Sequence, residues 1–285
     1  MKQITFASRN HQLTNINTWT PDSQWLVYDV RPSGASFTGE TIERVNVATG
    51  EVEVVYRATD GAHVGVVTVH PAEDKYDFIH GPKNPDADWR YDFHHRQGVI
   101  AQNGQVSNLD AMDITAPYTA GALRGGSHVH VFSPNGQLVS FTYNDHVLHE
   151  RDPKLDLRNV GVAAPYGPVN PQGTQIAFLM RDDNGIVQLW LISPAGGEPR
   201  QLTRTGSDIQ SAFNWHPAGD SLGFVLENRI ACCDALTGEV TFLTSDHGNP
   251  PSADAVVFSP DGRVIAWMEE TAGFRQLWVT ETAQY

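Results

Sequence analysis

The sequence predicts an all-β fold in which small antiparallel sheets repeat along one chain, and two observations support this prediction. The first is a phrase that returns six times, in which a turn led by proline separates two apolar runs. The second is that the two ends of the chain look like strands of one sheet divided between them. The six copies are Trp19-Thr20-Pro21-Asp22-Ser23, Val69-His70-Pro71-Ala72-Glu73, Phe132-Ser133-Pro134-Asn135-Gly136, Val169-Asn170-Pro171-Gln172-Gly173, Trp215-His216-Pro217-Ala218-Gly219 and Phe258-Ser259-Pro260-Asp261-Gly262.

The turn residues explain why each copy reverses the chain. Proline presets φ for the second turn position, and Gly, Asn or Asp tolerates the left-handed position that follows. The turn prolines are 21, 71, 134, 171, 217 and 260, at intervals of 50, 63, 37, 46 and 43 residues. A sheet of four short strands needs about 40–45 residues. The sequence therefore predicts a β-propeller of four-stranded blades, with six repeats visible.

The fourth and fifth repeats show the strands of a blade most clearly. Their hairpin signals are Asn184-Gly185 and Gly196-Gly197 in the fourth repeat and Thr237-Gly238 in the fifth. The expected strands cover 176–180, 187–192 and 199–203 in the fourth repeat, and 221–225, 229–234 and 239–243 in the fifth.

The N-terminal residues are expected to complete the last blade. Lys2-Gln3-Ile4-Thr5 resembles Arg200-Gln201-Leu202-Thr203, the outer strand of the fourth repeat. The last repeat ends at Gln276-Leu277-Trp278-Val279-Thr280, which resembles a third strand and leaves the outer position open. Pairing the two ends would close the last blade and cover an exposed strand edge.

We expect residues 1–285 to form a single domain. Two of the intervals between its turn prolines differ from the length of a blade. The 63-residue interval indicates an inserted loop region at 80–122, rich in Asp, Asn and Pro, and long loops of this kind often carry function. The 37-residue interval is too short for a blade. Either residues are missing near 169–171, or that blade is degenerate.

Charge and composition limit the partners that we expect. The formal net charge is −14, which argues against nucleic acid and anionic membrane surfaces. No apolar stretch reaches the roughly 20 residues that span a bilayer, and the start of the chain lacks the apolar core of a signal peptide. We therefore expect a cytoplasmic protein, and a monomer. No P-loop, G-x-S-x-G or paired CxxC motif indicates an NTPase, a hydrolase or a zinc ribbon.

The repeated Ser-Pro-Asp-Gly phrase with Gln-Leu-Thr outer strands resembles the TolB-type propellers, which include TolB, peptidase propellers and oligogalacturonate lyase. The wording at 15–36, 61–71, 109–143 and 174–203 is more specifically similar to the uncharacterised enterobacterial YidR family. This resemblance covers nearly the whole chain and implies no settled activity. It also implies a seventh blade in the intact family, and an additional segment just before Pro171.

Histidines at the innermost strand positions are the sharpest candidate site. In a strand, residues i and i+2 face the same side, so His128 and His130 are expected to point one way. Two convergent imidazoles form most of a divalent-metal site. A third ligand from a neighbouring blade, such as His63, would complete it. We therefore expect a divalent metal, manganese or zinc, as cofactor.

The resemblance to oligogalacturonate lyase adds roles for two residues. That enzyme holds a histidine-bound manganese on the propeller axis, where a base removes a proton from a uronate before β-elimination. By this likeness His63 is a ligand or the catalytic base. Arg31, which follows a strand-end Tyr28-Asp29-Val30, is a carboxylate clamp, a role that suits the bidentate guanidinium. The implied ligand is an acidic oligosaccharide.

Other readings remain open. His128 and His130 also fit channel-lining histidines that are hydrogen-bonded without a metal. The run Phe93-His94-His95-Arg96 reads as a solvated loop. The run Tyr143-Asn144-Asp145-His146 with His149-Glu150 reads either as part of the same rim or, in preference, as a turn capped by Asp145. The alternative to a metal-dependent, lyase-like protein is a non-catalytic scaffold that binds a protein partner. Whether the chain is an enzyme is left undecided by the sequence.

Overall fold

The computed structural model describes residues 1–32, 37–110, 112–136, 138–161, 172–246 and 248–282. In these ranges the secondary structure is strands, apart from one short helix, α1 (His146–Arg151), and one 3-10 turn, η1 (Pro153–Leu155). The all-β prediction is therefore confirmed. The chain divides into two compact units, Arg9–Pro165 and Met1–Ser8 with Tyr166–Tyr285.

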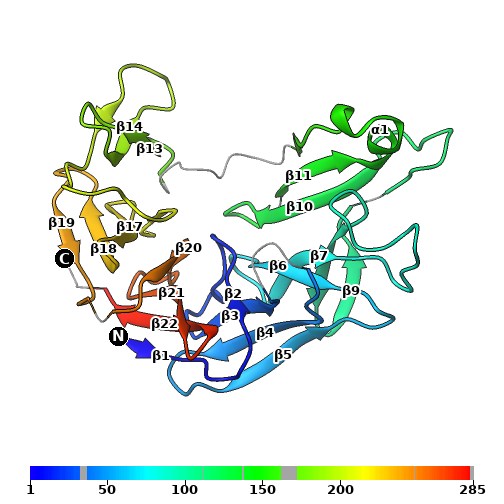
Figure 1. Cartoon of the computed structure of the whole chain (residues 1–285), viewed down its shortest axis with the longest axis horizontal. Coiled ribbons are helices and arrows are strands. Elements are labelled where there is room, and N and C mark those ends of the chain that lie inside the picture. The colour runs from blue at the N-terminus through cyan, green and yellow to red at the C-terminus, as the bar shows by residue number, and fades with distance from the viewer. Residues whose placement is uncertain (33–36, 111, 137, 162–171, 247, 283–285) are drawn as a thin grey trace. The chain divides into compact units, whose positions relative to one another are not determined.

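Three antiparallel sheets make up the unit Arg9–Pro165, and each is a meander of consecutive strands (Figure 1). The first sheet contains β2 (His11–Gln12), β3 (Trp25–Val30), β4 (Thr41–Asn46) and β5 (Val52–Arg57). The second contains β6 (Val64–Val69), β7 (Lys75–His80), β8 (Gln97–Gln102) and β9 (Gln105–Asn108). The third contains β10 (Gly125–Phe132), β11 (Val139–Asp145) and β12 (Asn159–Gly161).

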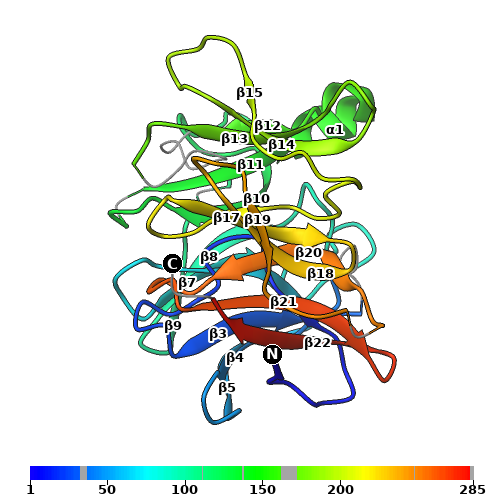
Figure 2. The same ribbon diagram turned by 90° about the vertical axis from the view of Figure 1, so that its left-hand side faces the viewer.

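The other unit also contains three antiparallel sheets. One consists of β13 (Ile176–Arg181), β14 (Val187–Ile192) and β15 (Arg200–Gln201). The next has β16 (Asn214–Trp215), β17 (Ser221–Leu226), β18 (Arg229–Asp234) and β19 (Val240–Phe242). The last is built from β20 (Pro251–Phe258), β21 (Val264–Thr271), β22 (Phe274–Glu281) and the N-terminal β1 (Lys2–Gln3) (Figure 2).

The N-terminal strand completes the last sheet, as the sequence predicts. In β1, Lys2 lies opposite Val279 and Gln3 lies opposite Trp278. The pairing continues past the strand, because the Ile4 amide donates to the Leu277 carbonyl at 2.9 Å. The Ile4 side chain is 1% exposed, so the first residues are packed into this unit as well as hydrogen-bonded to it.

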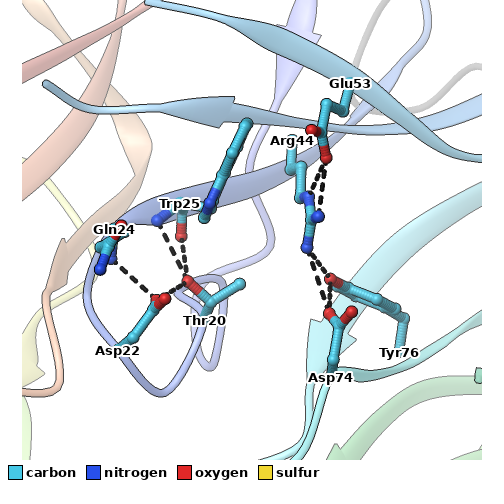
Figure 3. Close-up of polar contacts among 8 residues, drawn as sticks. All are labelled: Thr20, Asp22, Gln24, Trp25, Arg44, Glu53, Asp74 and Tyr76. Carbon is cyan, nitrogen blue, oxygen red and sulfur yellow. Dashed lines mark hydrogen bonds and ion pairs between the residues drawn. The ribbon is translucent and has the colours of Figure 1, made fainter. Parts of the chain in front are cut away.

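The repeated turn has a common hydrogen-bond pattern in three of its copies (Figure 3 shows the first). The hydroxyl before the proline donates to the Asp or Asn after it and accepts from the amide that opens the next strand. Thr20 does this with Asp22 at 2.6 Å and the Trp25 amide at 3.0 Å. Ser133 pairs in the same way with Asn135 and Leu138, and Ser259 with Asp261 and Val264.

Two copies of the turn replace the hydroxyl with histidine. His216 Nδ1 accepts the Ala218 amide at 3.2 Å, so Nε2 carries the proton and donates to the Gly262 carbonyl at 3.1 Å. His70 makes the equivalent contact, with Nε2 3.2 Å from the Gly136 carbonyl. Each imidazole therefore connects one turn to the turn of the next repeat.

Apolar side chains fill the space between adjacent sheets of each unit. In the unit Arg9–Pro165, Val27 and Ile42 pack with Val67 and Phe78 of the next sheet. A polar contact at the edge joins the same two sheets (Figure 3): Arg44 binds Glu53 at 2.7 Å and the Tyr76 hydroxyl at 2.8 Å. Burying a large apolar side chain stabilises the fold by about 1.5–3 kcal/mol, so this packing is the main cohesion between sheets.

The same arrangement holds in the unit of Met1–Ser8 with Tyr166–Tyr285. Leu189 of β14 packs with Leu222 and Phe224 of β17. Val225 of β17 packs with Trp267 of β21, on the far side of the same sheet. Within this unit, each sheet therefore packs against its neighbour in sequence.

Several sequence predictions concern the arrangement of these sheets. The described residues contain six sheets, one for each copy of the repeated phrase. Closure of the sheets into a ring and a seventh blade stay predictions. Within 80–122 the structure has β8 and β9, which complete the second sheet, and a connection at 81–96. Residues 169–171, where a segment was expected to be missing, lie outside the described residues. In the described part of the chain, no helix has the length and apolar character to cross a membrane.

Candidate functional site

The strands β6 and β10, which are the first strands of the second and third sheets, each contain an irregularity that changes the direction of their side chains. The pairing register shifts between Gly65 and Thr68 in β6 and between His128 and Val131 in β10. At each shift a valine has positive φ, 58° for Val66 and 52° for Val129. This conformation is costly for a β-branched residue and is maintained only by its surroundings. Bulges of this kind are frequent beside functional sites, where they redirect a side chain.

The bulge in β10 separates the environments of the two histidines that the sequence places on one face. The His130 ring is fully buried, with Nε2 2.9 Å from the Ser127 hydroxyl and Nδ1 3.5 Å from the Asp77 carboxylate. The His128 ring is only half-buried and lies edge-on to Phe37, at 6.4 Å between ring centroids. The alternation that predicts a common face applies to regular strands, and the strand is not regular here.

Arg31 and His63 occupy neighbouring positions of the first two sheets. Arg31 is buried at the end of β3, where its Nε donates to Asp29 at 2.6 Å and its guanidinium lies 4.6 Å from the centre of the Phe37 ring. Asp29 also accepts the Val66 amide at 2.7 Å, so this ion pair supports the bulge in β6. His63 precedes β6, is half-buried, and has an Nδ1 atom without a hydrogen bond from any described residue.

The structure does not bring His63, His128 and His130 together as a set of three close ligand atoms. Among the described residues, the group that meets this condition is His94, His95 and His146, whose ligand atoms all lie within 4.8 Å of one another. The role of His63, His128 and His130 as metal ligands, and of Arg31 and His63 in catalysis, therefore stays a prediction. The group of His94, His95 and His146 is called the histidine cluster below.

The closest contact of the histidine cluster joins His95 and His146. His95 Nδ1 lies 2.8 Å from the Arg90 carbonyl, to which it donates its proton. The lone pair of His95 Nε2 is thereby directed at His146 Nδ1, 3.2 Å away. A tetrahedral zinc ion with Zn–N bonds of about 2.0–2.1 Å holds two ligand nitrogens about 3.3 Å apart. The separation of these two nitrogens suits a shared metal ion as well as a hydrogen bond.

Two acidic turns fix the backbone around the histidine cluster. Asp86 accepts the amides of Asp88 and Trp89, at 2.9 and 2.7 Å, and so shapes the connection between β7 and β8. Asp145 caps α1 by accepting the Leu148 amide at 2.9 Å, which confirms the capping role predicted for it. The first residue of that helix is His146. Arg124 holds the cap in place with a 2.6 Å ion pair to Asp145.

Aromatic rings surround the histidine cluster. Trp89 stacks on His95 with centroids 4.0 Å apart, and its edge meets His146 at 5.2 Å. His149 stacks on His94 at 3.9 Å. His94 and His95 are 4% and 7% exposed. The interpretation of this run as a solvated loop is wrong, because the connection folds inward and the rings pack on each other.

Burial favours the neutral form of His94 and of His146. The pKa of His94 is lowered to about 4, first by burial and then by the neighbouring His95 and His149 rings. Burial also lowers the pKa of His146. Neutral imidazoles are the form that binds metal ions. His94 Nδ1 has no hydrogen-bond partner in the described structure and lies 3.8 Å from Asp92, a carboxylate placed to orient a ligating ring.

Arg96 directly follows the two histidines and is 4% exposed. Its Nε donates to the Ser127 carbonyl at 3.1 Å, and no carboxylate of the described residues forms an ion pair with it. Its charge acts on His128: burial first and then the Arg96 guanidinium lower the pKa of His128 to about 3. Arg96 therefore places a buried positive charge near His128 and directly after His94 and His95 in the chain.

Sequence reasoning named each part of the histidine cluster without joining them. The signal was the concentration of histidines in two segments about 50 residues apart, 94–95 and 146–149. The two segments meet because β8 of the second sheet, which follows His94 and His95, lies against β10 of the third sheet, and β11 of that sheet leads to His146. That contact depends on the side-by-side packing of two sheets, which no local pattern encodes.

Comparison with known proteins identifies relatives over nearly the whole chain. The family model described as a protein of unknown function, DUF3748, matches residues 63–176. The uncharacterized protein YidR of Escherichia coli strain K12 is 55% identical over 406 residues, an alignment that covers 99% of this chain and 97% of YidR. Since this alignment is longer than the 285 residues of the chain, part of YidR has no counterpart here.

Solved structures with a similar fold share little sequence. A gluconolactonase from Xanthomonas campestris has a TM-score of 0.52 at 13% identity, covering 98% of this chain and 89% of that one. A protein from Agrobacterium tumefaciens assigned to TolB has a TM-score of 0.51 at 14% identity, covering 99% and 93%. An oligogalacturonate lyase from Vibrio parahaemolyticus has a TM-score of 0.47 at 11% identity, covering 98% and 92%. The likeness to the TolB protein shows a TolB-like fold.

Proposed function

We propose that this chain, which belongs to the YidR family, is a ligand-binding protein whose site is built around a divalent metal ion. The observation that carries the proposal is the histidine cluster, in which three side chains offer ligand atoms within 4.8 Å of one another. The curated relative is uncharacterised, so the site and not the family supplies the argument.

The donor set fits the ion in type and in support. Imidazole nitrogen is a preferred ligand of zinc and binds manganese as well. A ligating histidine usually donates its second nitrogen to a carbonyl or carboxylate, which fixes the ring. His95 does so to the Arg90 carbonyl at 2.8 Å, and His94 has Asp92 at 3.8 Å. The ring stacking on Trp89 and His149 limits how far the ligands can turn.

The number of ligands favours a binding site over a purely structural one. Structural zinc sites are closed by four protein ligands, whereas sites with three leave a position for water or a ligand atom. An ion with such an open position would offset the charge of a carboxylate that binds there. This compensation matters in a protein whose net charge is −14. We therefore propose that the ligand is acidic, in line with the acidic oligosaccharide expected from the sequence.

The metal content of the protein tests this proposal. We expect untagged protein, dialysed against Zn²⁺ or Mn²⁺ and then against buffer, to retain about one ion per chain by elemental analysis. His146→Ala should lose the ion, because it removes one of three ligands, and it does so at a half-buried helix start. His128→Ala is the matched control, and it should keep the ion. Circular dichroism checks that both variants are folded.

Two outcomes would change the assignment. Loss of the ion from His128→Ala with retention in His146→Ala would place the site at His63, His128 and His130 instead. A wild-type protein that binds neither ion would overturn the metal proposal and leave the scaffold for a protein partner. Lyase activity is measured separately, as a gain of ultraviolet absorbance when metal-loaded protein is incubated with oligogalacturonates.

A further inference from the structure

A cavity of about 400 Å³ lies within the unit Arg9–Pro165 and shares two side chains with the surroundings of the histidine cluster. His95 and Trp89 line it from the connection that carries the cluster, and Tyr56 lines it from β5. Ligand cavities in proteins are typically about 300–1,000 Å³. This one has room for a small organic molecule beside the candidate metal ligands.

The charge of the cavity lining is unusual for this chain. Among the described residues that line the cavity there is no carboxylate, although the protein carries 33 acidic residues against 19 basic ones. It contains one lysine, Lys83, which forms no ion pair with any described residue. Burial lowers the pKa of His80, which also lines the cavity, and the charge of Lys83 acts in the same direction. Lys83 is exposed at the rim of the cavity, and a single cation beside a lining of this kind suits an anion with one charge.

The remaining polar groups suit hydroxyl groups on the same ligand. The side-chain amides of Gln97 and Asn108 line the cavity, and no hydrogen bond joins either amide to another described residue. The Tyr56 hydroxyl is already 3.0 Å from His80 Nε2, which fixes that wall. Amides that can both donate and accept are the usual partners of ligand hydroxyls, and the rings of Trp89 and Tyr56 offer apolar contact.

We propose that this cavity binds a small hydroxylated carboxylate, with the carboxylate at Lys83 and the hydroxyl groups at Gln97 and Asn108. The inference rests on the proposed function only through His95, which belongs to both the cavity lining and the histidine cluster. The ligand is either a free sugar acid or the end of an acidic oligosaccharide, since both present the same chemistry.

Isothermal titration calorimetry of the full chain tests this inference with defined probes. We expect D-glucuronate to bind and D-glucose, which lacks the carboxylate, to bind at least tenfold more weakly. Trigalacturonate tests the end of a longer chain, and its rank against glucuronate distinguishes the two sources. Lys83→Gln should reduce glucuronate affinity at least tenfold. Lys154→Gln removes an exposed lysine of the same unit and should have no effect.

The results separate this inference from the metal proposal. Equal binding of glucuronate and glucose, or unchanged affinity in Lys83→Gln, would overturn the inference whatever the metal content. Glucuronate binding that depends on Lys83 in a protein without metal would support the cavity and overturn only the metal proposal. Asn108→Ala provides a second variant at an exposed position, with an expected several-fold loss of affinity, in case Lys83→Gln fails to fold.

Discussion

Single residues show how strongly the fold keeps its inner histidines neutral. Burial lowers the pKa of His128 and of His130 to about 3, and the Arg96 guanidinium acts in the same direction. In the unfolded chain a histidine binds its proton near pH 6.5. Between about pH 6.5 and pH 3 the unfolded state therefore binds more protons than the native state. The contribution of these histidines to the free energy of unfolding falls as the pH decreases through that range.

Replacing one of these histidines should flatten the pH dependence. We expect His128→Gln to reduce the slope of unfolding free energy against pH by up to about 1.4 kcal/mol per pH unit between pH 6 and 4. Urea denaturation of metal-free protein at each pH measures it. Asp77, whose pKa is raised by burial, titrates with the opposite sign in both proteins and cancels in the difference. Parallel curves for variant and wild type would contradict the prediction.

The sequence identifies the chemistry of single residues better than their orientation. The composition of β10 places His128 and His130 on one strand, as predicted. The alternation argument then fails at Val129, because a positive φ at a valine is maintained by contacts from other strands and leaves no trace in the local sequence. The burial of His94 and His95 was missed for the same reason: it depends on how the connection at 81–96 folds against β10 and α1.

At the scale of elements, the repeated turn is the most predictable part of the fold. The Pro-led phrase predicts where one strand ends and the next begins, because proline and the αL residue after it determine the local backbone. The hydrogen bond from His216 to the Gly262 carbonyl could not be predicted, because it joins two repeats. Gly262 has a φ of +73°, and a Cβ atom there would lie 2.2 Å from His216 Nε2. The glycine is thus required both by its backbone conformation and by the imidazole against it.

Two glycine variants separate these requirements. We expect Gly262→Ala to lower the free energy of unfolding by about 3 kcal/mol, from a strained φ and a steric clash. Gly273→Ala is the matched control, since Gly273 has a φ of +81° with no atom within 4 Å of its Cβ position. It should lose only the backbone term, about 1–2 kcal/mol. Urea denaturation compares them, and equal losses would show that the His216 contact is unimportant.

For the whole molecule, the excess of negative charge is the property with the broadest effect. With a net charge of −14, the excess acidic side chains repel one another in the compact state. Salt screens this repulsion, with a Debye length of about 8–10 Å at physiological ionic strength. We expect the thermal midpoint to rise by about 2–4 °C between 20 and 300 mM NaCl, as about 1 kcal/mol would cause. KCl should give the same rise. A midpoint that falls with salt would indicate that ion pairs such as Arg9–Glu43 dominate instead.

The sequence predicts antiparallel sheets and the number of strands in most of them, but it does not predict which sheets belong to which compact unit. Four of the six described sheets have four strands, and the N-terminal strand lies where it was expected. The separation into two compact units follows from contacts between distant segments, whereas the repeat pattern is the same on both sides. The 63-residue interval is explained by the long connection at 81–96, which carries His94 and His95.

The imidazole that reaches from one turn into the next has a practical consequence for anyone who rearranges this protein. If one repeat is grafted, duplicated or deleted, two features have to be preserved. Its own turn needs the imidazole donor, and the turn of the following repeat needs a glycine whose carbonyl accepts the hydrogen bond. A chimera joined between His216 and Gly262 takes the second turn from another protein. If that turn has a bulkier residue in place of Gly262, or offers no acceptor, His216 Nε2 loses its hydrogen-bond partner. Boundaries chosen so that such couples travel together should yield folded hybrids more often than boundaries drawn at the prolines.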